Sequence, residues 1–307
     1  MSVRAVVIHA SKGTSGEISG LGEACIDLHG RLTSPRKREP GLSSSSFQGS
    51  VPALIGALGR PDFHERLDAA LREPVPFNLS CVFAYSSQER PRLVHDGLND
   101  VAPARVMTDY LNGGYLLDCV YTACKRGLSG GLYRLHDIAP DAFFEGPYFN
   151  SPEIHPCISL ESGALAEEIV FIAPDGCGQS LAYSLLRSNG CDPFSAREFS
   201  ILRDVAPTVG ALLARHGAEP MEPRGDSSSA PTGPGPTFES FARDRLSHRE
   251  RAVVRLVLEG HSTPSIALTL GIAEGTVKNH RKNIHARLGI SSQAELFALF
   301  LRHVRGT

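Results

Sequence analysis

Residues 275–289, GTVKNHRKNIHARLG, carry four Lys and Arg side chains and no acidic residue. At helical spacing Lys278 and Lys282 lie on one face. The apolar residues fall on another face, and these are Val277, Ile284 and Leu288. Like charges at i and i+4 destabilise an isolated helix by roughly 0.2–0.5 kcal/mol per pair. A polyanion along the basic face would remove that repulsion, so the pattern predicts binding of nucleic-acid phosphates, with an ordinary solvated helix face as the alternative.

The distribution of charge along the chain favours the first interpretation. The 307 residues have a net charge of −2, with 41% hydrophobic and 21% charged residues, which is a globular composition. Residues 240–307 contain 11 Lys and Arg against 5 Asp and Glu, whereas residues 1–239 contain 20 against 28. Positive charge is therefore concentrated at the C-terminus, and a chain of this length is predicted to hold two domains.

Composition divides the chain into four segments. Residues 1–49 are rich in Gly, Ser and Arg, and we expect a disordered extension there. Residues 50–216 alternate helix and strand patterns. Residues 217–240 combine Pro, Gly and Ser without periodic apolar positions, which predicts a flexible linker. Residues 241–307 then form the basic C-terminal domain.

Capping and stop signals divide the C-terminal domain into short helices. An S-x-x-E capping box begins at Ser247, and Gly260 ends the helix that follows. A second helix of barely two turns ends at Gly271, where a tight turn leads into the basic helix. The S-x-x-E pattern recurs at Ser292 ahead of a fourth helix. Four short helices with a turn before the third predict an all-α helix-turn-helix domain.

The C-terminal sequence LSHRERAVVRLVLEGHSTPSIALTLGIAEGTVKNHRKNIHARLGISSQAELF resembles the LuxR-type (NarL/FixJ or GerE-type) helix-turn-helix domain. The matching residues are Leu246, Arg249, Glu250, Gly260, Ile266, Ala267, Leu270, Thr276, Val277, Lys278, His280, Ile284, Leu288 and Gly289. The sequence departs from the family pattern at Ala273, at Thr263-Pro264-Ser265 and at Gln293.

The resemblance implies a transcriptional regulator that binds double-stranded DNA. We expect it to act in the cytoplasm, and as a homodimer because one such small domain buries little surface on DNA. The resemblance also implies that Lys278 and Lys282 face base edges in the major groove, where lysine can donate to guanine O6 and N7. By the same resemblance, Thr276, His280 and Arg281 are expected near phosphates, and the last helix is expected to carry a dimer contact. The predicted DNA-binding residues are Thr276, Lys278, Asn279, His280, Arg281 and Lys282.

Residues 50–216 are predicted to form an α+β domain with an antiparallel sheet. The expected elements are a helix pair over 51–75 interrupted at Pro61, a strand over 78–86, a helix over 115–127, a hairpin turning at Asp175-Gly176 and a long helix over 192–217 capped by Ser195. The order of these elements resembles the GAF/PAS-like sensor halves of one-component regulators. We therefore expect this domain to receive the signal that controls DNA binding.

Polar and aromatic residues of the sensor domain could line a site for a small-molecule effector. The candidates are Tyr110, Tyr115, Asp118 and Tyr121, with His136 and Glu168 as further ones. At helical spacing Tyr115, Asp118 and Tyr121 share a side, which would place a carboxylate between aromatic rings. Ordinary core packing of these rings is the alternative. For the whole domain, docking of a partner protein competes with binding of a small molecule.

Other kinds of signal and site fit the sequence poorly. The ligand pocket of quorum-sensing LuxR relatives depends on tryptophans, and this chain contains no Trp, which disfavours an acyl-homoserine lactone. The acidic pair and the later Asp, Thr and Lys of a phosphorylated receiver domain are missing as well. Among possible metal ligands, His136, His155 and Cys157 are spread over a loop region, so no metal is predicted.

Enzymatic activity and membrane insertion are also disfavoured. The chain has no G-x-S-x-G motif and no glycine-rich nucleotide loop between a strand and a helix, so we expect no catalysis and no cofactor. Its seven cysteines are scattered without a C-x-x-C pair, as in reduced cytoplasmic proteins. No apolar run approaches the roughly 20 residues of a membrane span.

Overall fold

The structure is a computed structural model that describes residues 44–86, 89–98, 104–147, 149, 165–176, 178–188, 190–218 and 238–305, without the side chains of residues 104–106. Contacts divide the chain into Met1–Gly41 and Leu42–Thr307. Every described residue therefore belongs to the second unit.

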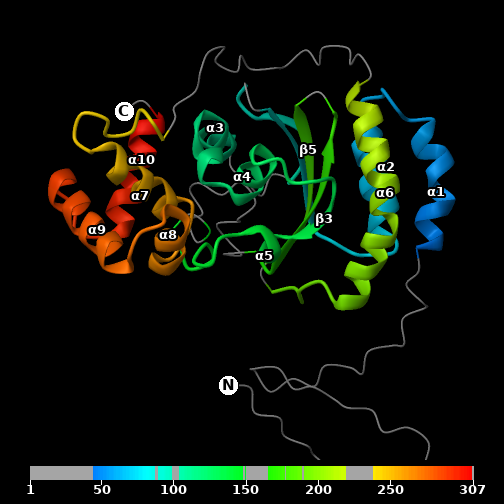
Figure 1. Ribbon diagram of the computed structural model, residues 1–307. Helices are drawn as coiled ribbons and strands as arrows, with labels where there is room; N and C mark the ends of the chain where they lie inside the picture. Colours follow the sequence, from blue (N-terminus) through cyan, green and yellow to red (C-terminus); the bar gives the residue numbers. More distant parts are fainter. Residues whose placement is uncertain are drawn as a thin grey trace, which may run out of the picture. The chain divides into compact units, whose positions relative to one another are not determined.

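A five-stranded antiparallel sheet lies at the centre of residues 44–218, here called the sensor domain (Figure 1). Its strands are β1 (Leu79–Ser86), β2 (Arg92–Gly97), β3 (Gly131–Arg134), β4 (Glu167–Pro174) and β5 (Gln179–Arg187), in the order β2-β1-β5-β4-β3. Val82 pairs with Tyr183 across β1 and β5, and Val170 pairs with Ser184 across β4 and β5. The predicted strand and hairpin are confirmed, and the Asp175 amide closes the hairpin by donating to the Gln179 carbonyl at 2.9 Å.

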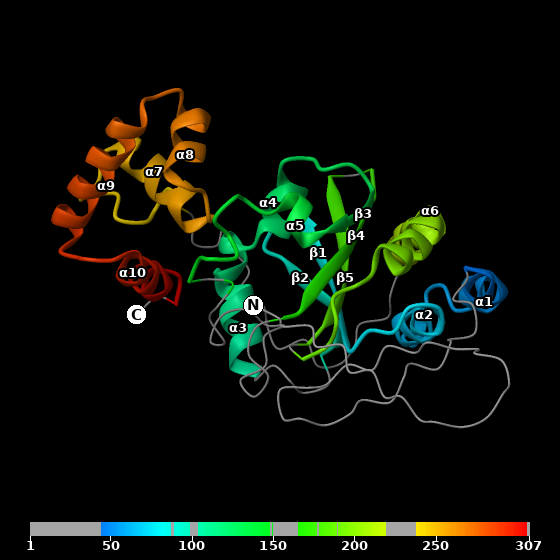
Figure 2. The same ribbon diagram turned by 90° about the horizontal axis from the view of Figure 1, so that it is seen from below.

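Helices cover both faces of the sheet (Figure 2). One face carries α2 (Phe63–Arg72) and α6 (Ala196–Ala218), with α1 (Ser45–Ile55) packed against these two helices. The other carries α3 (Ala104–Asn112), the 3-10 helix η1 (Gly114–Leu117), α4 (Cys119–Lys125) and α5 (Leu135–Ile138). Side chains of β1 alternate between two cores, so Phe83 and Tyr85 join the α4 side while Val82 and Ala84 join the α6 side. The predicted combination of an antiparallel sheet with helices is confirmed.

Two of the predicted segment boundaries need correction. Helix α1 begins at Ser45, inside the segment that we expected to be disordered, because Phe47 is 1% exposed and anchors this helix to the core. Residues 1–43 of that segment lie outside the described residues. At the other end, α6 continues to Ala218, and the Phe238 ring stacks on Phe300 with centroids 5.0 Å apart. Both ends of the predicted linker 217–240 are thus part of the folded domains, and residues 219–237 are not described.

The helix predicted over 115–127 is wrong as a single helix, because η1 and α4 meet at Asp118. The Asp118 backbone is extended, with φ −81° and ψ 126°, and its side chain accepts a hydrogen bond from the Val120 amide at 2.7 Å. An aspartate stabilises a helix more as an N-cap than as an interior residue. Tyr115 and Tyr121 therefore lie on different helices. The long helix predicted over 192–217 is confirmed, with the Glu198 amide donating to Ser195 Oγ.

Four helices form the C-terminal domain, residues 238–305: α7 (His248–Leu258), α8 (Thr263–Leu270), α9 (Glu274–Leu288) and α10 (Gln293–Arg305). The capping box between Ser247 and Glu250 is confirmed. Left-handed glycines end α8 and α9, with φ 63° at Gly271 and φ 69° at Gly289. The predicted helix-turn-helix arrangement is thus confirmed, with α8 as its first helix and α9 as its second.

We expect Gly260→Ala to lower the free energy of unfolding by about 1–3 kcal/mol. Gly260 has φ +94°, and a Cβ atom there would lie 2.7 Å from Cα of Phe143. The matched control is Gly275→Ala, because Gly275 lies in α9 and a Cβ atom added there would meet no atom within 4 Å. That control should leave stability unchanged or raise it by up to ~1 kcal/mol. Urea unfolding curves measure both, and equal effects of the two substitutions would contradict the prediction.

Candidate nucleic-acid interface and sensor cluster

Helix α9 separates an apolar face from a polar one. Its buried residues are Val277, Ile284 and Leu288, which are 0%, 1% and 6% exposed. These residues face α7 and α8, against which α9 packs. The predicted amphipathic division of the basic helix is confirmed, because hydrophobic burial fixes which side chains α9 turns away from the core.

The polar face of α9 presents two unpaired lysines. Thr276, Lys278, Asn279 and Lys282 are exposed, and His280 is half-buried. Within the described part of the chain, neither Lys278 nor Lys282 makes a hydrogen bond or an ion pair. One helical turn separates these two residues, so both ammonium groups are available on the same side to an anionic ligand.

Arg281 differs from the two lysines because its guanidinium is held within the domain. It donates to Thr263 Oγ1 on α8 at 3.3 Å and to Gln293 Oε1 on α10 at 3.0 Å. Both acceptors are positions at which the sequence departs from the family pattern. The side chain thus ties α9 to its two neighbours and positions the basic helix.

A second ion pair orients the end of α9 relative to α7. Arg287 lies 3.2 Å from Glu250 Oε2, the carboxylate of the capping box. Burial favours the neutral form of Glu250, yet hydrogen bonds from Ser247 and the Arg287 charge keep the pKa of this carboxyl below its usual value. Glu250 is therefore ionised at neutral pH and links the start of α7 to the end of α9.

In the sensor domain the four predicted ligand residues come together around Asp118. Tyr110 Oη donates to Asp118 Oδ2 at 2.6 Å. The Tyr115 and Tyr121 rings pack edge to face with ring centroids 4.8 Å apart, and the centroids of the Tyr115 and Tyr110 rings are 6.5 Å apart. Burial raises the pKa of Asp118, although hydrogen bonds from Tyr110 and the Val120 amide oppose that rise. The juxtaposition expected from one helical face is achieved by three separate segments.

Glu168 supplies a second buried carboxyl on the same side of the sheet. Its Oε1 accepts a hydrogen bond from Ser184 Oγ at 2.6 Å. Burial, together with the negative charge of Asp118, raises the pKa of Glu168 to about 8. At neutral pH this carboxyl is therefore largely protonated and can donate a hydrogen bond, whereas ordinary glutamates cannot.

Comparison with known proteins gives the following relationships. Residues 244–300 match the family described as bacterial regulatory proteins, luxR family. A protein of Aeromonas salmonicida, named as an HTH-type transcriptional regulator in the exeN 3′ region, is 38% identical over 193 residues, which cover 59% of this chain and 92% of that protein. The transcriptional regulatory protein MctR of Rhizobium johnstonii is 43% identical over 60 residues, or 20% of this chain and 28% of MctR. The crystal structure of the VqsR LBD domain from Pseudomonas aeruginosa aligns with a TM-score of 0.45 and 23% identity, over 55% of this chain and 95% of that domain.

The chain belongs to the luxR family of bacterial regulatory proteins. It is a DNA-binding transcriptional regulator of the LuxR type, with the helix-turn-helix formed by α8 and α9. The similarity to the Aeromonas protein extends well beyond residues 244–300, so it includes part of the sensor domain.

In this LuxR-type regulator, two residues that hydrogen-bond to the buried group around Asp118 and Glu168, here called the Asp118 cluster, were not identified from sequence. Tyr85 Oη lies 2.7 Å from Tyr110 Oη, and Ser184 partners Glu168. The alternation of β1 could have indicated Tyr85, because it points to the same side as Phe83. Ser184 could be assigned only from the register of β4 and β5.

The remaining predicted sites have simple outcomes. The His136 ring stacks on Phe144 with centroids 4.0 Å apart, outside the Asp118 cluster. His155 and Cys157 lie outside the described residues. Elsewhere in the chain, as far as it is described, no three His, Cys, Asp or Glu side chains gather in a way that could hold a metal ion. None of the described helices is both long and apolar enough to cross a bilayer.

We expect Glu168→Gln to weaken the pH dependence of stability. The folded pKa of about 8 lies above the ordinary value of 4.5, so Glu168 contributes stability that is complete below about pH 4.5 and is lost as the pH rises to 8. The variant should melt at a higher temperature than the wild type at pH 8, because glutamine can still accept from Ser184 but cannot ionise. The exposed Glu65 on α2 offers a control, since Glu65→Gln should retain the wild-type profile. A Glu168→Gln variant that loses stability between pH 5 and 8 as steeply as the wild type would contradict this assignment.

Proposed function

We propose that this protein is a one-component regulator that reads DNA with the polar face of α9 and is controlled by a signal received by the sensor domain. The observation that carries the proposal is the pair of exposed lysines, Lys278 and Lys282, one helical turn apart and unpaired among the described residues. In a helix-turn-helix the second helix enters the major groove while the first crosses the backbone.

Each residue on this face has a role that its chemistry supports. Lys278 and Lys282 donate to guanine O6 or N7, and Asn279 can pair with adenine N6 and N7. Thr276 and His280 lie where contacts to phosphates would fix the register of the helix. Arg281 was predicted at a phosphate as well. Its hydrogen bonds to Thr263 and Gln293 support a positioning role, with the phosphate contact secondary.

The Asp118 cluster supports a small molecule as the signal. It combines phenol groups, a carboxylate and the largely neutral Glu168 on an otherwise apolar side of the sheet. Such a set suits a ligand with an apolar body and a polar head that both donates and accepts hydrogen bonds. The antiparallel sheet with helices on both faces also supports the GAF/PAS-like resemblance of the sensor. Docking of a partner protein on the sensor is the alternative function.

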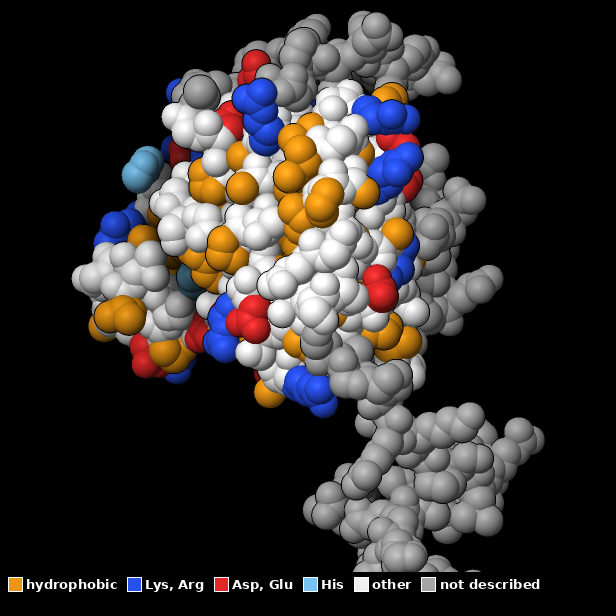
Figure 3. Space-filling view, turned by 90° about the vertical axis from the view of Figure 1, so that its right-hand side faces the viewer, with side chains coloured by type: hydrophobic (Ala, Val, Ile, Leu, Met, Phe, Trp, Pro, Cys, Tyr) orange, Lys and Arg blue, Asp and Glu red, His pale blue; other side chains and the backbone are white. Residues whose placement is uncertain are grey.

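A homodimer is proposed because a single small DNA-binding domain buries little surface on DNA. The sensor face that carries α1 and α6 is a candidate contact. In Figure 3 hydrophobic side chains gather toward the middle of this face and charged ones toward its edges. Ile55, at the end of α1, is 55% exposed. Cytoplasmic localisation is part of the same proposal.

Replacing either lysine should weaken specific DNA binding and relax base preference. We expect Lys278→Ala and Lys282→Ala each to weaken binding about tenfold, because a good base contact discriminates by ~1–3 kcal/mol. The measurement uses duplexes that the wild type selects from a random pool, followed by selection with each variant. Arg243→Ala is the control, because it removes one exposed positive charge of the same domain away from α9. Unchanged affinity and unchanged selected sequences for both lysine variants would contradict the recognition-helix assignment.

Native mass spectra of the full-length protein should show a dimer that carries a discrete small-molecule mass when it is purified from its own host. Tyr110→Phe should lower the fraction of the protein that carries this small molecule, because the substitution removes the hydroxyl that donates to Asp118. Tyr133→Phe, which removes an exposed hydroxyl on β3, is the matched control. A ligand-free dimer that captures another protein would favour the alternative, and a monomer would contradict the proposed homodimer.

A further inference from the structure

The segment that follows α5 contacts the turn between α7 and α8. The Ala142 amide donates to the Gly260 carbonyl at 2.9 Å. Asp141 Oδ1 accepts from the Ser262 amide at 2.9 Å, and its Oδ2 accepts from Ser262 Oγ. We call residues 139–146 the docking loop, because these hydrogen bonds join the sensor domain to the first turn of the helix-turn-helix.

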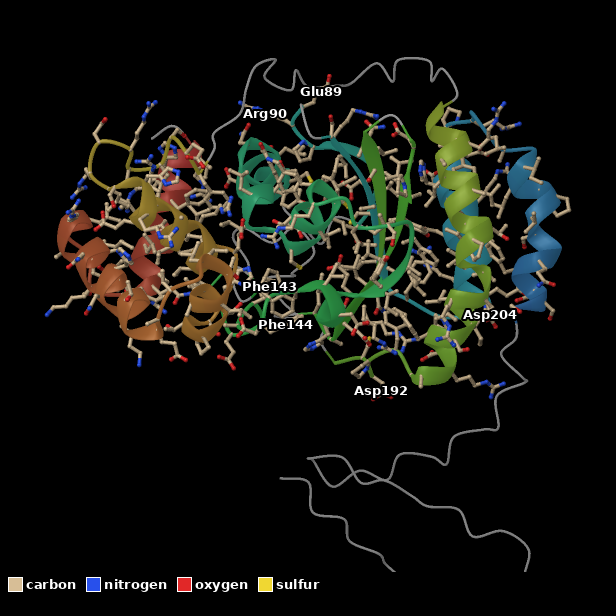
Figure 4. The ribbon with its side chains drawn as sticks, in the orientation of Figure 1. Glu89, Arg90, Phe143, Phe144, Asp192 and Asp204 are labelled. Atoms are coloured by element: carbon tan, nitrogen blue, oxygen red, sulfur yellow. The ribbon has the colours of Figure 1, made fainter. Side chains whose placement is uncertain are left out.

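Phe143 fills the apolar part of this contact. It is 2% exposed and belongs to a continuous hydrophobic cluster that includes side chains from the C-terminal domain. The cavity beside it, lined by Val257, Gly260 and Phe297 among others, has a volume of about 10 Å³, room for about one water molecule. Figure 4 labels Phe143 and Phe144 on the loop. Because Gly260 has no side chain, the loop backbone can approach this turn closely.

Two ion pairs also join the sensor domain to the C-terminal domain. Arg126, just after α4, lies 3.3 Å from the buried Glu259 at the end of α7. Asp109 on α3 lies 2.7 Å from Arg305 on α10. The sensor domain thus holds the C-terminal domain through apolar, hydrogen-bonded and ionic contacts together.

The position of Asp141 matters for DNA binding. Its carboxylate lies at the N-terminal end of α8, the first helix of the helix-turn-helix. In such motifs the first helix crosses the DNA backbone, and free amides and hydroxyls at helix N-termini bind phosphate oxygens. Burial favours protonation of Asp141, but hydrogen bonds from Ser262 and the nearby His261 keep its pKa below the usual value. At neutral pH an anion therefore occupies the end of α8.

We propose that the docking loop is an autoinhibitory contact in which Asp141 competes with a DNA phosphate for the Ser262 amide and hydroxyl. The inference rests on the proposed DNA-binding function and adds a mechanism of control to it. A carboxylate and a phosphate cannot share these two donors, and their like charges repel each other. DNA binding thus favours the state in which the docking loop has left α8, and the docked state is the low-affinity one.

Helices α4 and α5 connect the Asp118 cluster to the docking loop. Asp118 caps α4, α4 packs on α5, and α5 leads into the loop. Arg126, which holds Glu259, follows the last residue of α4. A ligand that binds the Asp118 cluster better when α4 has shifted would release both contacts, in proportion to its difference in affinity for the two states.

The test uses the full-length protein and a DNA duplex of mixed sequence, because phosphate contacts dominate non-specific binding. Asp141→Asn keeps an acceptor for Ser262 but removes the negative charge. We expect it to bind about five- to tenfold more tightly, a typical allosteric coupling. Asp137→Asn is the charge-matched control, because Asp137 is exposed on α5 and makes no hydrogen bond or ion pair among the described residues.

Phe143→Ala provides a second variant that leaves the charge unchanged. It should also tighten binding, because it weakens the apolar contact of the loop, and thermal melts will confirm that the C-terminal domain remains folded. If Lys278→Ala weakens binding while both loop variants bind as tightly as the wild type or less tightly, the autoinhibitory contact is wrong and the DNA-binding function stands. If neither the wild type nor any variant binds the duplex, the proposed function itself fails.

Discussion

Burial of both faces of the sensor sheet is the constraint on which the rest of the molecule depends. A polar side chain on either face must find a hydrogen-bond partner there, because an unsatisfied buried group costs about 1–3 kcal/mol. On the α6 side Asp68 accepts from Ser80 at 2.5 Å and also from Tyr183 and Arg72. On the α4 side Ser184 satisfies Glu168, and Tyr110 satisfies Asp118. These pairs fix how the helices sit on the sheet.

The two buried acids show that burial alone does not decide the charge of a group. Desolvation favours the neutral form of both. For Asp68, hydrogen bonds from His95, Ser80 and Tyr183 outweigh it, so the pKa of Asp68 is lowered. Among the described residues, Glu168 has one hydroxyl donor, Ser184, and the negative charge of Asp118 lies nearby, so its pKa rises to about 8. One acid therefore acts as a fixed charged tie between α2 and the sheet, whereas the other is a titratable group inside the sensor cluster.

The same principle operates in the C-terminal domain, where pairing decides which basic residues remain available. Arg281 is held by Thr263 and Gln293, and Arg287 is held by Glu250. Lys278 and Lys282 have no such partner among the described residues, so their ammonium groups remain available to bind DNA. Positive charge on α9 is thus divided between residues that shape the domain and residues that meet a ligand. At the N-terminal end of α8, the carboxylate of Asp141 accepts a hydrogen bond from the Ser262 amide, so the amide that an external anion could bind already has an acceptor within the chain.

The sequence by itself determined the C-terminal domain, because local signals agree there: the capping box at Ser247, the left-handed Gly271 and the apolar positions of α9 each act within a few residues. It also determined the main strands and the long helix α6 of the sensor. The break at Asp118, the partnership of Glu168 with Ser184 and the fixed position of Arg281 were decided only by the tertiary structure. The contact of Asp141 with Ser262, 121 residues apart in the chain, belongs to the same group. The physical reason is that most of these interactions join residues far apart in sequence. Periodicity and capping preferences act over a few residues and therefore do not predict which distant residues are in contact.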